Sequence, residues 1–203
     1  MRTVKESSDE LNPPVVTSAV ITRARGRRSL ADNLALAFAT WGVGYLPVAP
    51  GTFGSIVGVA LYLLVEAATA RLFAFGLARG WTLAFNASFR MTLLLLLVAV
   101  VTLVGVWAAT RAEKLLGRKD PGIVVVDEVA GQLIAFLFVP FNSAWWVIIM
   151  GFAAFRLFDI WKPYPIRRLE ALEAGLGIMA DDVLAGIYAA ILMSLVTSIY
   201  LWS

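Results

Sequence analysis

The 203-residue sequence contains neither cysteine nor histidine. Without them the chain cannot form a disulfide, a thiolate nucleophile, a Cys/His zinc site, a phosphohistidine or a Ser-His-Asp triad. Any catalytic group has to come from Asp, Glu, Lys, Arg, Ser, Thr or Tyr. A metal site would need oxygen ligands, which suit hard cations such as Mg²⁺ or Mn²⁺.

Charged residues are scarce as well. They make up 15% of the chain, whereas 60% of the residues are hydrophobic and the mean hydropathy is +0.81. Soluble domains are typically about 45–50% apolar and about 25% charged. Because the apolar excess comes in long runs, the sequence predicts helices that face lipid. We expect one all-α, polytopic, membrane-embedded domain at residues 31–203.

The N-terminal segment is polar and basic. Six of the 17 Lys and Arg residues fall between Arg2 and Arg28. We interpret residues 1–30 as a disordered cytoplasmic tail that follows the positive-inside rule. No aromatic residue is interleaved with these charges, so the segment lacks the pattern of a nucleic-acid-binding surface.

Three apolar runs are long enough to predict membrane spans, at residues 54–70, 91–109 and 183–202. Between the first two, residues 71–90 carry three arginines and are predicted to form an amphipathic segment at the opposite interface. A polar loop is expected at 110–128.

A short helix and a turn are predicted before the first span. The helix covers residues 32–40, with Asp32 or Asn33 as its N-cap. The Gly/Pro-rich residues 41–51 form the turn.

The apolar run at 129–158 is interrupted at residues 140–143, whose sequence is PFNS. Two architectures are open: one kinked span, or two half-length helices that turn there and return to the same side. A single span would place Lys162, Arg167 and Arg168 outside, so the positive-inside rule favours the helical hairpin. Asn or Ser of the turn could cap the second helix.

Four polar clusters lie at the ends of apolar segments, and the hairpin would place all four on the cytoplasmic side. They are Gly51, Thr52 and Ser55; Asp127 and Glu128; Arg156, Asp159 and Lys162; and Asp181 and Asp182. Each has an ordinary structural explanation. Three can be helix caps or turns, and the Arg–Asp–Lys cluster can be an ion-pair ladder.

Together, however, the clusters suggest metal-assisted phosphoryl chemistry. The carboxylates can hold a divalent cation, and the helix start at Gly51 is a natural anion site. Arg156, Asp159 and Lys162 share a face about 120° wide if they are helical. Gln132, one turn after Glu128, could orient a ligand. Water or an aspartate is the candidate nucleophile.

Four segments in this order resemble the bacterial phosphatidylglycerophosphatase A family: WGVGYLPVAPGTFGS (41–55), VDEVAGQ (126–132), FRLFDIWKPYPI (155–166) and GLGIMADDVLAG (175–186). The resemblance implies an all-helical, Mg²⁺-dependent enzyme of the inner membrane. It would hydrolyse the terminal phosphate of phosphatidylglycerophosphate, its phospholipid substrate, at the cytoplasmic face. The tail and residues 71–90 depart from the family pattern but lie away from these segments.

The resemblance also implies the site residues. The expected metal ligands are Asp127, Glu128, Asp159, Asp181 and Asp182. The expected catalytic residues are Asp127, Glu128, Arg156, Asp159, Lys162 and Asp182. The expected phosphate-binding residues are Gly51, Thr52, Ser55, Arg156 and Lys162.

Other classes fit less well. Type-2 phosphatidic acid phosphatases depend on histidine, which is absent, and the DG-x₂-AR…G-x₃-D-x₃-D motif of CDP-alcohol phosphatidyltransferases is missing. A small transporter or channel with interfacial ion pairs remains the alternative. Its acidic residues, however, would be expected near the membrane midplane rather than at one edge.

Overall fold

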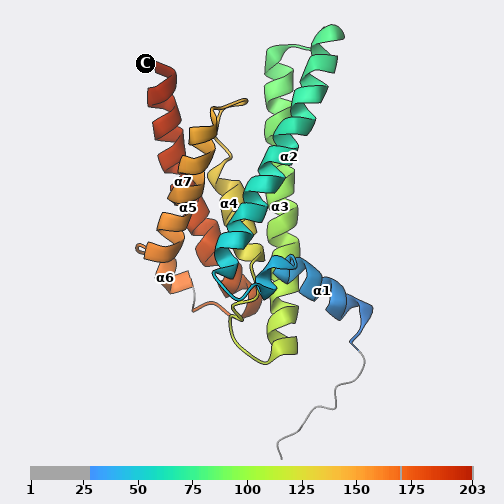
Figure 1. Ribbon diagram of the computed structural model, residues 1–203, viewed down its shortest axis with the longest axis vertical. Coiled ribbons are helices and arrows are strands. Elements are labelled where there is room, and N and C mark those ends of the chain that lie inside the picture. The colour runs from blue at the N-terminus through green and yellow to red at the C-terminus, as the bar shows by residue number, and fades with distance from the viewer. Residues whose placement is uncertain (1–27, 170, 203) are drawn as a thin grey trace, which may run out of the picture.

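The computed structural model describes residues 28–169 and 171–202, and the regular structure within them is all helical (Figure 1). The elements are α1 (Leu30–Thr40), the 3₁₀ helix η2 (Val43–Tyr45), α2 (Pro50–Ala78), α3 (Leu83–Leu116), α4 (Val126–Ala135), α5 (Trp145–Trp161), α6 (Ile166–Leu169) and α7 (Ala174–Trp202). The all-α prediction is confirmed. Residues 1–27 of the predicted tail lie outside the described residues.

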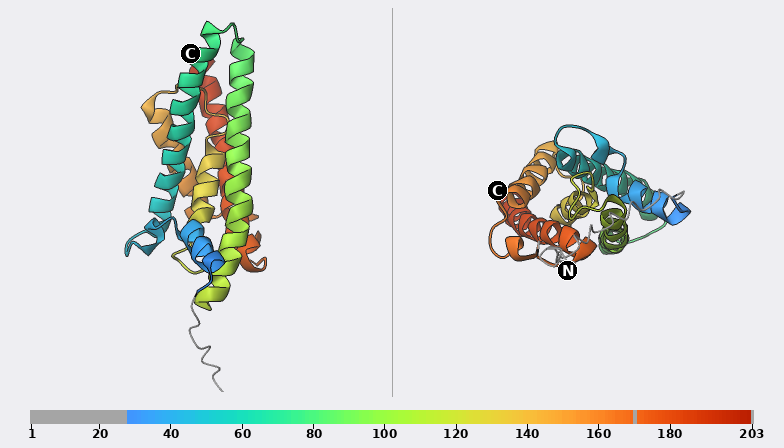
Figure 2. Two further views of the ribbon diagram at one scale, coloured as in Figure 1. Left: turned by 90° about the vertical axis from the view of Figure 1, so that its right-hand side faces the viewer. Right: turned by 90° about the horizontal axis from the view of Figure 1, so that it is seen from below.

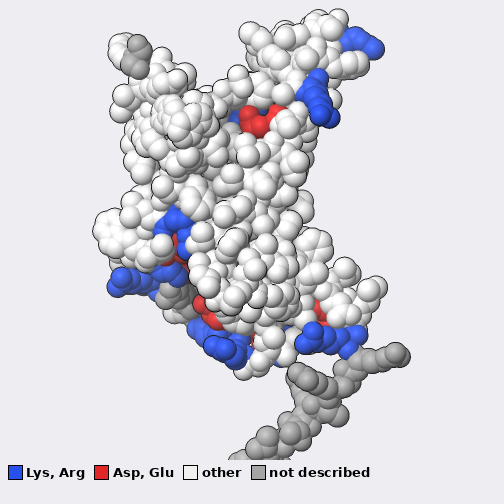
Figure 3. All heavy atoms as spheres, in the orientation of Figure 1, with Lys and Arg blue, Asp and Glu red and all other residues white. Residues whose placement is uncertain are grey.

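Three helices, α2, α3 and α7, are long and apolar enough to cross a membrane. They have 29, 34 and 29 residues. At about 1.5 Å per residue their lengths are about 44–51 Å, against about 30 Å of hydrocarbon. Each predicted span therefore lies within a longer helix. On the face shown in Figure 3, a broad belt of uncharged side chains separates two charged ends, as expected for a surface that faces lipid.

Helix α4 lies in the middle of the bundle, with α2, α3, α5 and α7 around it (Figure 2). All its residues except Asp127 and Glu128 are buried. Gly131 and Gly186 allow α4 and α7 to touch, because a Cβ on Gly186 would overlap the backbone of Gly131. Small residues commonly permit such close helix approach in membranes. This contact brings the acidic start of α4 close to the acidic residues of α7.

Helices α4 and α5 form the predicted hairpin rather than one kinked span. The chain turns over residues 136–144, and α5 then returns so that its end borders the same cavity as the start of α4. The carbonyl of Val139 in this turn accepts a hydrogen bond from Arg90 Nη2 at 2.9 Å. Non-helical backbone at membrane depth requires such a partner from the protein.

The segment predicted at residues 71–90 is not a separate amphipathic element. Helix α2 continues to Ala78 and α3 starts at Leu83, so these residues form the tip of a helical hairpin (Figure 2). Three arginines suggested an interface, but Arg90 is buried and its Nε lies 2.5 Å from Glu66 Oε1. The partner is 24 residues away on another helix, so local sequence gave no sign of it.

The predicted caps of two short helices are also wrong. The N-cap of α1 is Ser29, and Asp32 occupies the third helical position, where it closes a capping box with Ser29. The N-cap of α5 is Ala144, which makes no side-chain cap. Neither Asn142 nor Ser143 caps that helix. Ser29 is itself a favoured N-cap residue that the prediction passed over, whereas Ala144 is not.

The predicted turn and the predicted loop differ from the structure in their content and bounds. The turn predicted at 41–51 contains η2 and ends where Pro50 opens α2, a position that suits proline. The loop predicted at 110–128 is shorter, because α3 continues to Leu116. Arg111 belongs to this helix, where its Nε lies 2.7 Å from Asp32 Oδ1.

Candidate active site

Helix ends from distant parts of the chain meet around a cavity of about 760 Å³. It lies at the end of the bundle opposite the α2–α3 tip and the C-terminus (Figure 1). The cavity is bordered by the starts of α2, α4 and α7, the end of α5 and the loop before α4. Nine charged side chains line it: Lys119, Asp120, Asp127, Glu128, Arg156, Asp159, Lys162, Asp181 and Asp182. Three of the four predicted clusters are thus brought together completely.

Three of these carboxylates form a compact group. One oxygen each from Asp127, Glu128 and Asp182 lies within 4.8 Å of the other two. Capping does not explain the group. The N-cap of α4 is Val125, and α7 starts at Ala174, so that Asp182 lies about two turns inside its helix and is 3% exposed.

The surroundings of the group favour a bound cation. Burial, followed by the nearby Glu128 and Asp182 carboxylates, raises the pKa of Asp127 well above its usual range. Burial also raises the pKa of Glu128. Asp127 Oδ1 and Glu128 Oε2 are buried and have no hydrogen-bond partner among the described residues. A hard divalent cation would supply the missing partner and relieve the repulsion, so these residues fit a metal.

The other two predicted ligands face cations instead. Asp159 Oδ2 lies 2.6 Å from Arg156 Nη1, and Asp181 Oδ2 lies 2.7 Å from Lys162 Nζ. Both cations come from the end of α5, where Lys162 is the left-handed C-cap residue. The five predicted carboxylates therefore divide into three that are clustered and two that are ion-paired.

Of the predicted phosphate-binding turn, Gly51 borders the cavity, whereas Thr52 and Ser55 do not line it. A Cβ on Gly51 would overlap the Glu128 carboxylate and lie 3.3 Å from Arg156 Nη1, so glycine allows these groups to approach the backbone. Ser55 is fully buried and its hydroxyl donates to the Gly51 carbonyl at 3.0 Å. Because α2 already starts at Pro50, Ser55 lies within the helix instead of capping it.

The sequence profile of the phosphatidylglycerophosphatase A family matches residues 37–197. The chain belongs to this family. It is 43% identical to a Bacteroides thetaiotaomicron protein named as a candidate phosphatidylinositol-3-phosphatase, over 76% of this chain and 87% of that protein. It is 35% identical to phosphatidylglycerophosphatase A of Haemophilus influenzae, over 81% and 89% of the two chains. The corresponding Escherichia coli protein is 30% identical, over 82% and 85%. No solved structure matches the chain.

As a member of the phosphatidylglycerophosphatase A family, the chain is a phosphatase and hence an enzyme. All nine charged residues of the cavity fall within the range that the family profile matches. The family therefore favours the enzymatic interpretation of the cavity over the transporter alternative.

Lys119 and Asp120 also line the cavity, although neither was predicted as a site residue. They lie in the loop before α4, which leads directly to the acidic pair of that helix. The basic residues of this loop were used only to predict the membrane orientation. The position of Gln132 does not support its predicted role in orienting a ligand. Its Nε2 donates to the Gly151 carbonyl at 3.4 Å and so links α4 to α5, and it does not line the cavity.

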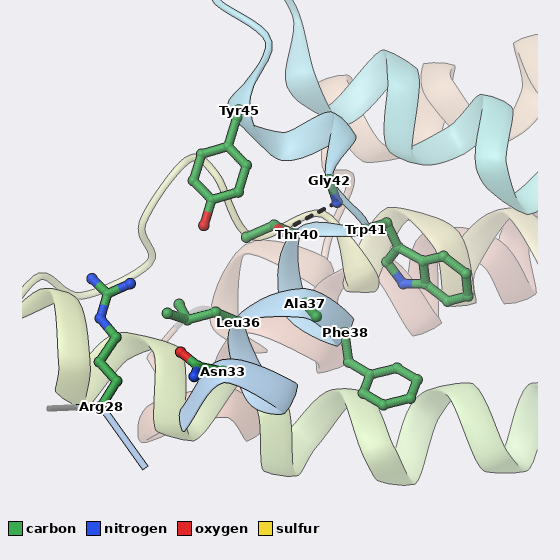
Figure 4. A pocket seen from close by; sticks show the side chains of 9 residues that line it. All are labelled: Arg28, Asn33, Leu36, Ala37, Phe38, Thr40, Trp41, Gly42 and Tyr45. Atoms are coloured by element: carbon green, nitrogen blue, oxygen red, sulfur yellow. Dashed lines mark hydrogen bonds between the residues drawn. The ribbon is translucent and has the colours of Figure 1, made fainter. Parts of the chain in front are cut away.

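A second cavity, of about 580 Å³, lies against α1 and η2 (Figure 4). Its lining includes the apolar side chains of Leu36, Phe38 and Trp41, while Arg28 and Tyr45 stand at one edge. No carboxylate of the described residues lines it. The first cavity therefore offers the groups that metal-assisted phosphoryl chemistry needs, and the second does not.

Proposed function

We propose that this enzyme hydrolyses the terminal phosphate of phosphatidylglycerophosphate, with Mg²⁺ as cofactor, at the cytoplasmic face of the bacterial inner membrane. The main support is the presence in one cavity of the compact group Asp127, Glu128 and Asp182 beside Arg156 and Gly51. The carboxylates suit a hard cation, and a guanidinium suits a phosphate. The names of the two phosphatidylglycerophosphatase A relatives support the substrate.

Each group has a distinct role in this proposal. Asp127, Glu128 and Asp182 would hold the cation, which supplies neutralisation of phosphoryl charge when bound. Arg156 donates hydrogen bonds to the phosphoryl oxygens, and Lys162 adds a second positive charge. Asp159 and Asp181, first expected to be metal ligands, hold these two cations in position through their ion pairs.

The reaction breaks the bond between the terminal phosphorus and the glycerol oxygen. The oxygen of a water molecule adds to phosphorus, and a cavity carboxylate accepts one of its protons. The protonated carboxylate then returns this proton to the glycerol oxygen, which leaves as a hydroxyl, so that the products are phosphatidylglycerol and inorganic phosphate. Gly51 keeps the start of α2 close enough for backbone and guanidinium to approach the same phosphoryl group.

Phosphate release by the purified protein tests the substrate. The assay compares phosphatidylglycerophosphate with phosphatidylinositol 3-phosphate, since the Bacteroides relative makes the inositol lipid a second candidate. We expect a higher kcat/KM with the glycerol lipid. Faster hydrolysis of the inositol lipid would favour the second candidate, and no phosphate from either lipid would contradict both.

Thiol labelling tests the membrane orientation, because the chain has no cysteine of its own. Single cysteines at Lys119 and Arg168 lie near the cavity end, and one at Arg79 lies at the α2–α3 tip. A membrane-impermeant reagent should label the first two from the cytoplasm and the third from the opposite side. Labelling of the first two from opposite sides would contradict a single composite site.

A further inference from the structure

The outer face of α5 carries an exposed apolar stripe. Ile149, Leu157 and Ile160 are 56%, 53% and 72% exposed, and Ala153 between them is exposed as well. Their spacing of four, four and three residues places them on one side of a helix. We call these four residues the α5 stripe.

The α5 stripe leads into the polar cavity. Ile160 belongs to both, because it lines the cavity and is also the most exposed member of the stripe. Arg156 lies about 40° around the helix from Ile160, one turn earlier. Its pair with Asp159 therefore adjoins the point where the apolar surface ends. Figure 3 shows charged atoms in a hollow on this flank, higher than the basic lower edge of the molecule and bordered by uncharged side chains.

The length of the α5 stripe matches one leaflet of a bilayer. From Ile149 to Ile160 the helix rises about 16 Å, which is roughly half of the 30 Å hydrocarbon thickness. An acyl chain of one leaflet could therefore lie along the whole stripe, with its polar end at Ile160.

We propose that the lipid substrate enters the cavity sideways from the membrane along α5, with an acyl chain on the α5 stripe and its phosphate at Arg156. The inference rests on the proposed function and adds to it the surface that binds the lipid tail. Entry from the side of the cavity where Lys119 is exposed would require the acyl chains to leave the hydrocarbon, which the hydrophobic effect opposes. Sideways entry keeps the tail in lipid while the head group reaches the cations.

Two substrates with the same head group test this route: phosphatidylglycerophosphate with long acyl chains, and the same lipid with butyryl chains. The variant Ala153→Trp places a bulky side chain on the stripe about 10 Å along the helix from Ile160, outside the cavity lining and beyond the reach of a butyryl chain. Its matched control is Ile199→Trp, because Ile199 is 71% exposed and lies near the far end of α7. Both replacements are on exposed positions, so the fold should tolerate them.

For the long-chain lipid, Ala153→Trp should lower kcat/KM roughly tenfold, mainly through KM, because the indole blocks the path of the tail. For the butyryl lipid, kcat/KM should stay within about twofold of the wild-type value. Ile199→Trp should leave kcat/KM unchanged with both lipids. An equal loss with both lipids, or no loss, overturns the sideways route. If the wild-type protein releases phosphate from neither lipid, the proposed function itself fails.

A binding measurement gives a readout independent of turnover. A long-chain analogue with a phosphonate head group and a diazirine in its acyl chain should label the segment 149–160 on irradiation. Excess unlabelled phosphatidylglycerophosphate should suppress this labelling, and excess phosphatidylcholine should not. Labelling that both lipids suppress equally would show only bulk lipid contact and would overturn the proposal.

Discussion

The two ends of the bundle both enclose charge, but they balance it differently. Near the α2–α3 tip, Arg90 pairs with Glu66 at 2.5 Å and also donates to the Tyr62 hydroxyl and the Val139 carbonyl. One positive and one negative charge cancel there. The cavity at the other end has six carboxylates and three cations along its lining. A balanced pair holds helices together, whereas an acidic excess is suited to a cationic ligand.

Metal removal should produce the largest effect, because, of the two ends compared, it is the cavity that carries an excess of negative charge. Treatment with excess EDTA is expected to reduce phosphate release to background, and added Mg²⁺ should restore it. Mg²⁺ should also raise the Tm of the wild-type protein, since it binds the folded state. Full activity after the metal is confirmed absent would contradict the proposed cofactor.

Replacement of single carboxylates in the compact group should have the second-largest effect. Asp127→Asn, Glu128→Gln and Asp182→Asn should each lower kcat by about two to three orders of magnitude, comparable to the loss of a key transition-state contact. The metal-free variants should remain as stable as the wild type, because an amide relieves the repulsion within the group. Asp159→Asn should also be severe, since Arg156 loses its partner.

Asp120→Asn is the matched control for these variants. Asp120 lies at the exposed rim of the same cavity, and its φ of 46° is one that asparagine also adopts. We expect activity close to that of the wild type. An equal loss in this variant would mean that general cavity charge matters, and not the compact group.

Near the α2–α3 tip, substitutions should change the free energy of unfolding rather than the catalytic activity. Arg90→Leu leaves Glu66, whose side chain is 14% exposed, without its partner and should lower the free energy of unfolding by about 3 kcal/mol. The double variant Arg90→Leu/Glu66→Leu should recover much of this loss, because an apolar pair needs no charge partner. Thermal unfolding in detergent measures both. If the double variant is less stable than the single one, the ion pair is not the main contribution of these residues.

The smallest effect is expected from Asp32, outside the spanning helices. A hydrogen bond from the Ser29 backbone, aided by Arg111, lowers the pKa of Asp32 below its usual 3.8. A lowered folded pKa gives stabilisation that is present above the unfolded value and is lost as pH falls through the folded value. The Tm difference between wild type and Asp32→Asn should therefore be constant above about pH 5 and should shrink at more acidic pH. A difference that grows on acidification would contradict this assignment.

The membrane architecture was largely predictable from the sequence. Long apolar runs partition into lipid whatever their partners are, so the three spans could be located without tertiary information. The hairpin at residues 129–158 also followed from local features, namely an interrupting proline and the distribution of basic residues. At residues 71–90 the burial of Arg90 could not be predicted, because its environment depends on Glu66, which belongs to another helix.

Most residues of the candidate site could be predicted from the sequence, but their positions relative to one another could not. The acidic pairs and the Arg156, Asp159 and Lys162 cluster stood out because charge next to apolar runs is unusual. Thr52 and Ser55 were expected at the site from their residue types, but the early start of α2 turns Ser55 into the helix. Lys119 and Asp120 gave no local signal of their proximity to the cavity.

By itself, the sequence determined that the helices face lipid and which side-chain types can bind a metal. Its composition requires lipid around the helices, and the absence of cysteine and histidine limits any metal to oxygen ligands. Only the tertiary structure decided which carboxylates share a cluster and which neutralise cations. The contact of Gly131 with Gly186 brings α7 against α4 and places Asp182 beside Asp127. Electrostatic interactions depend on distances between helix ends far apart in the chain, and packing sets those distances.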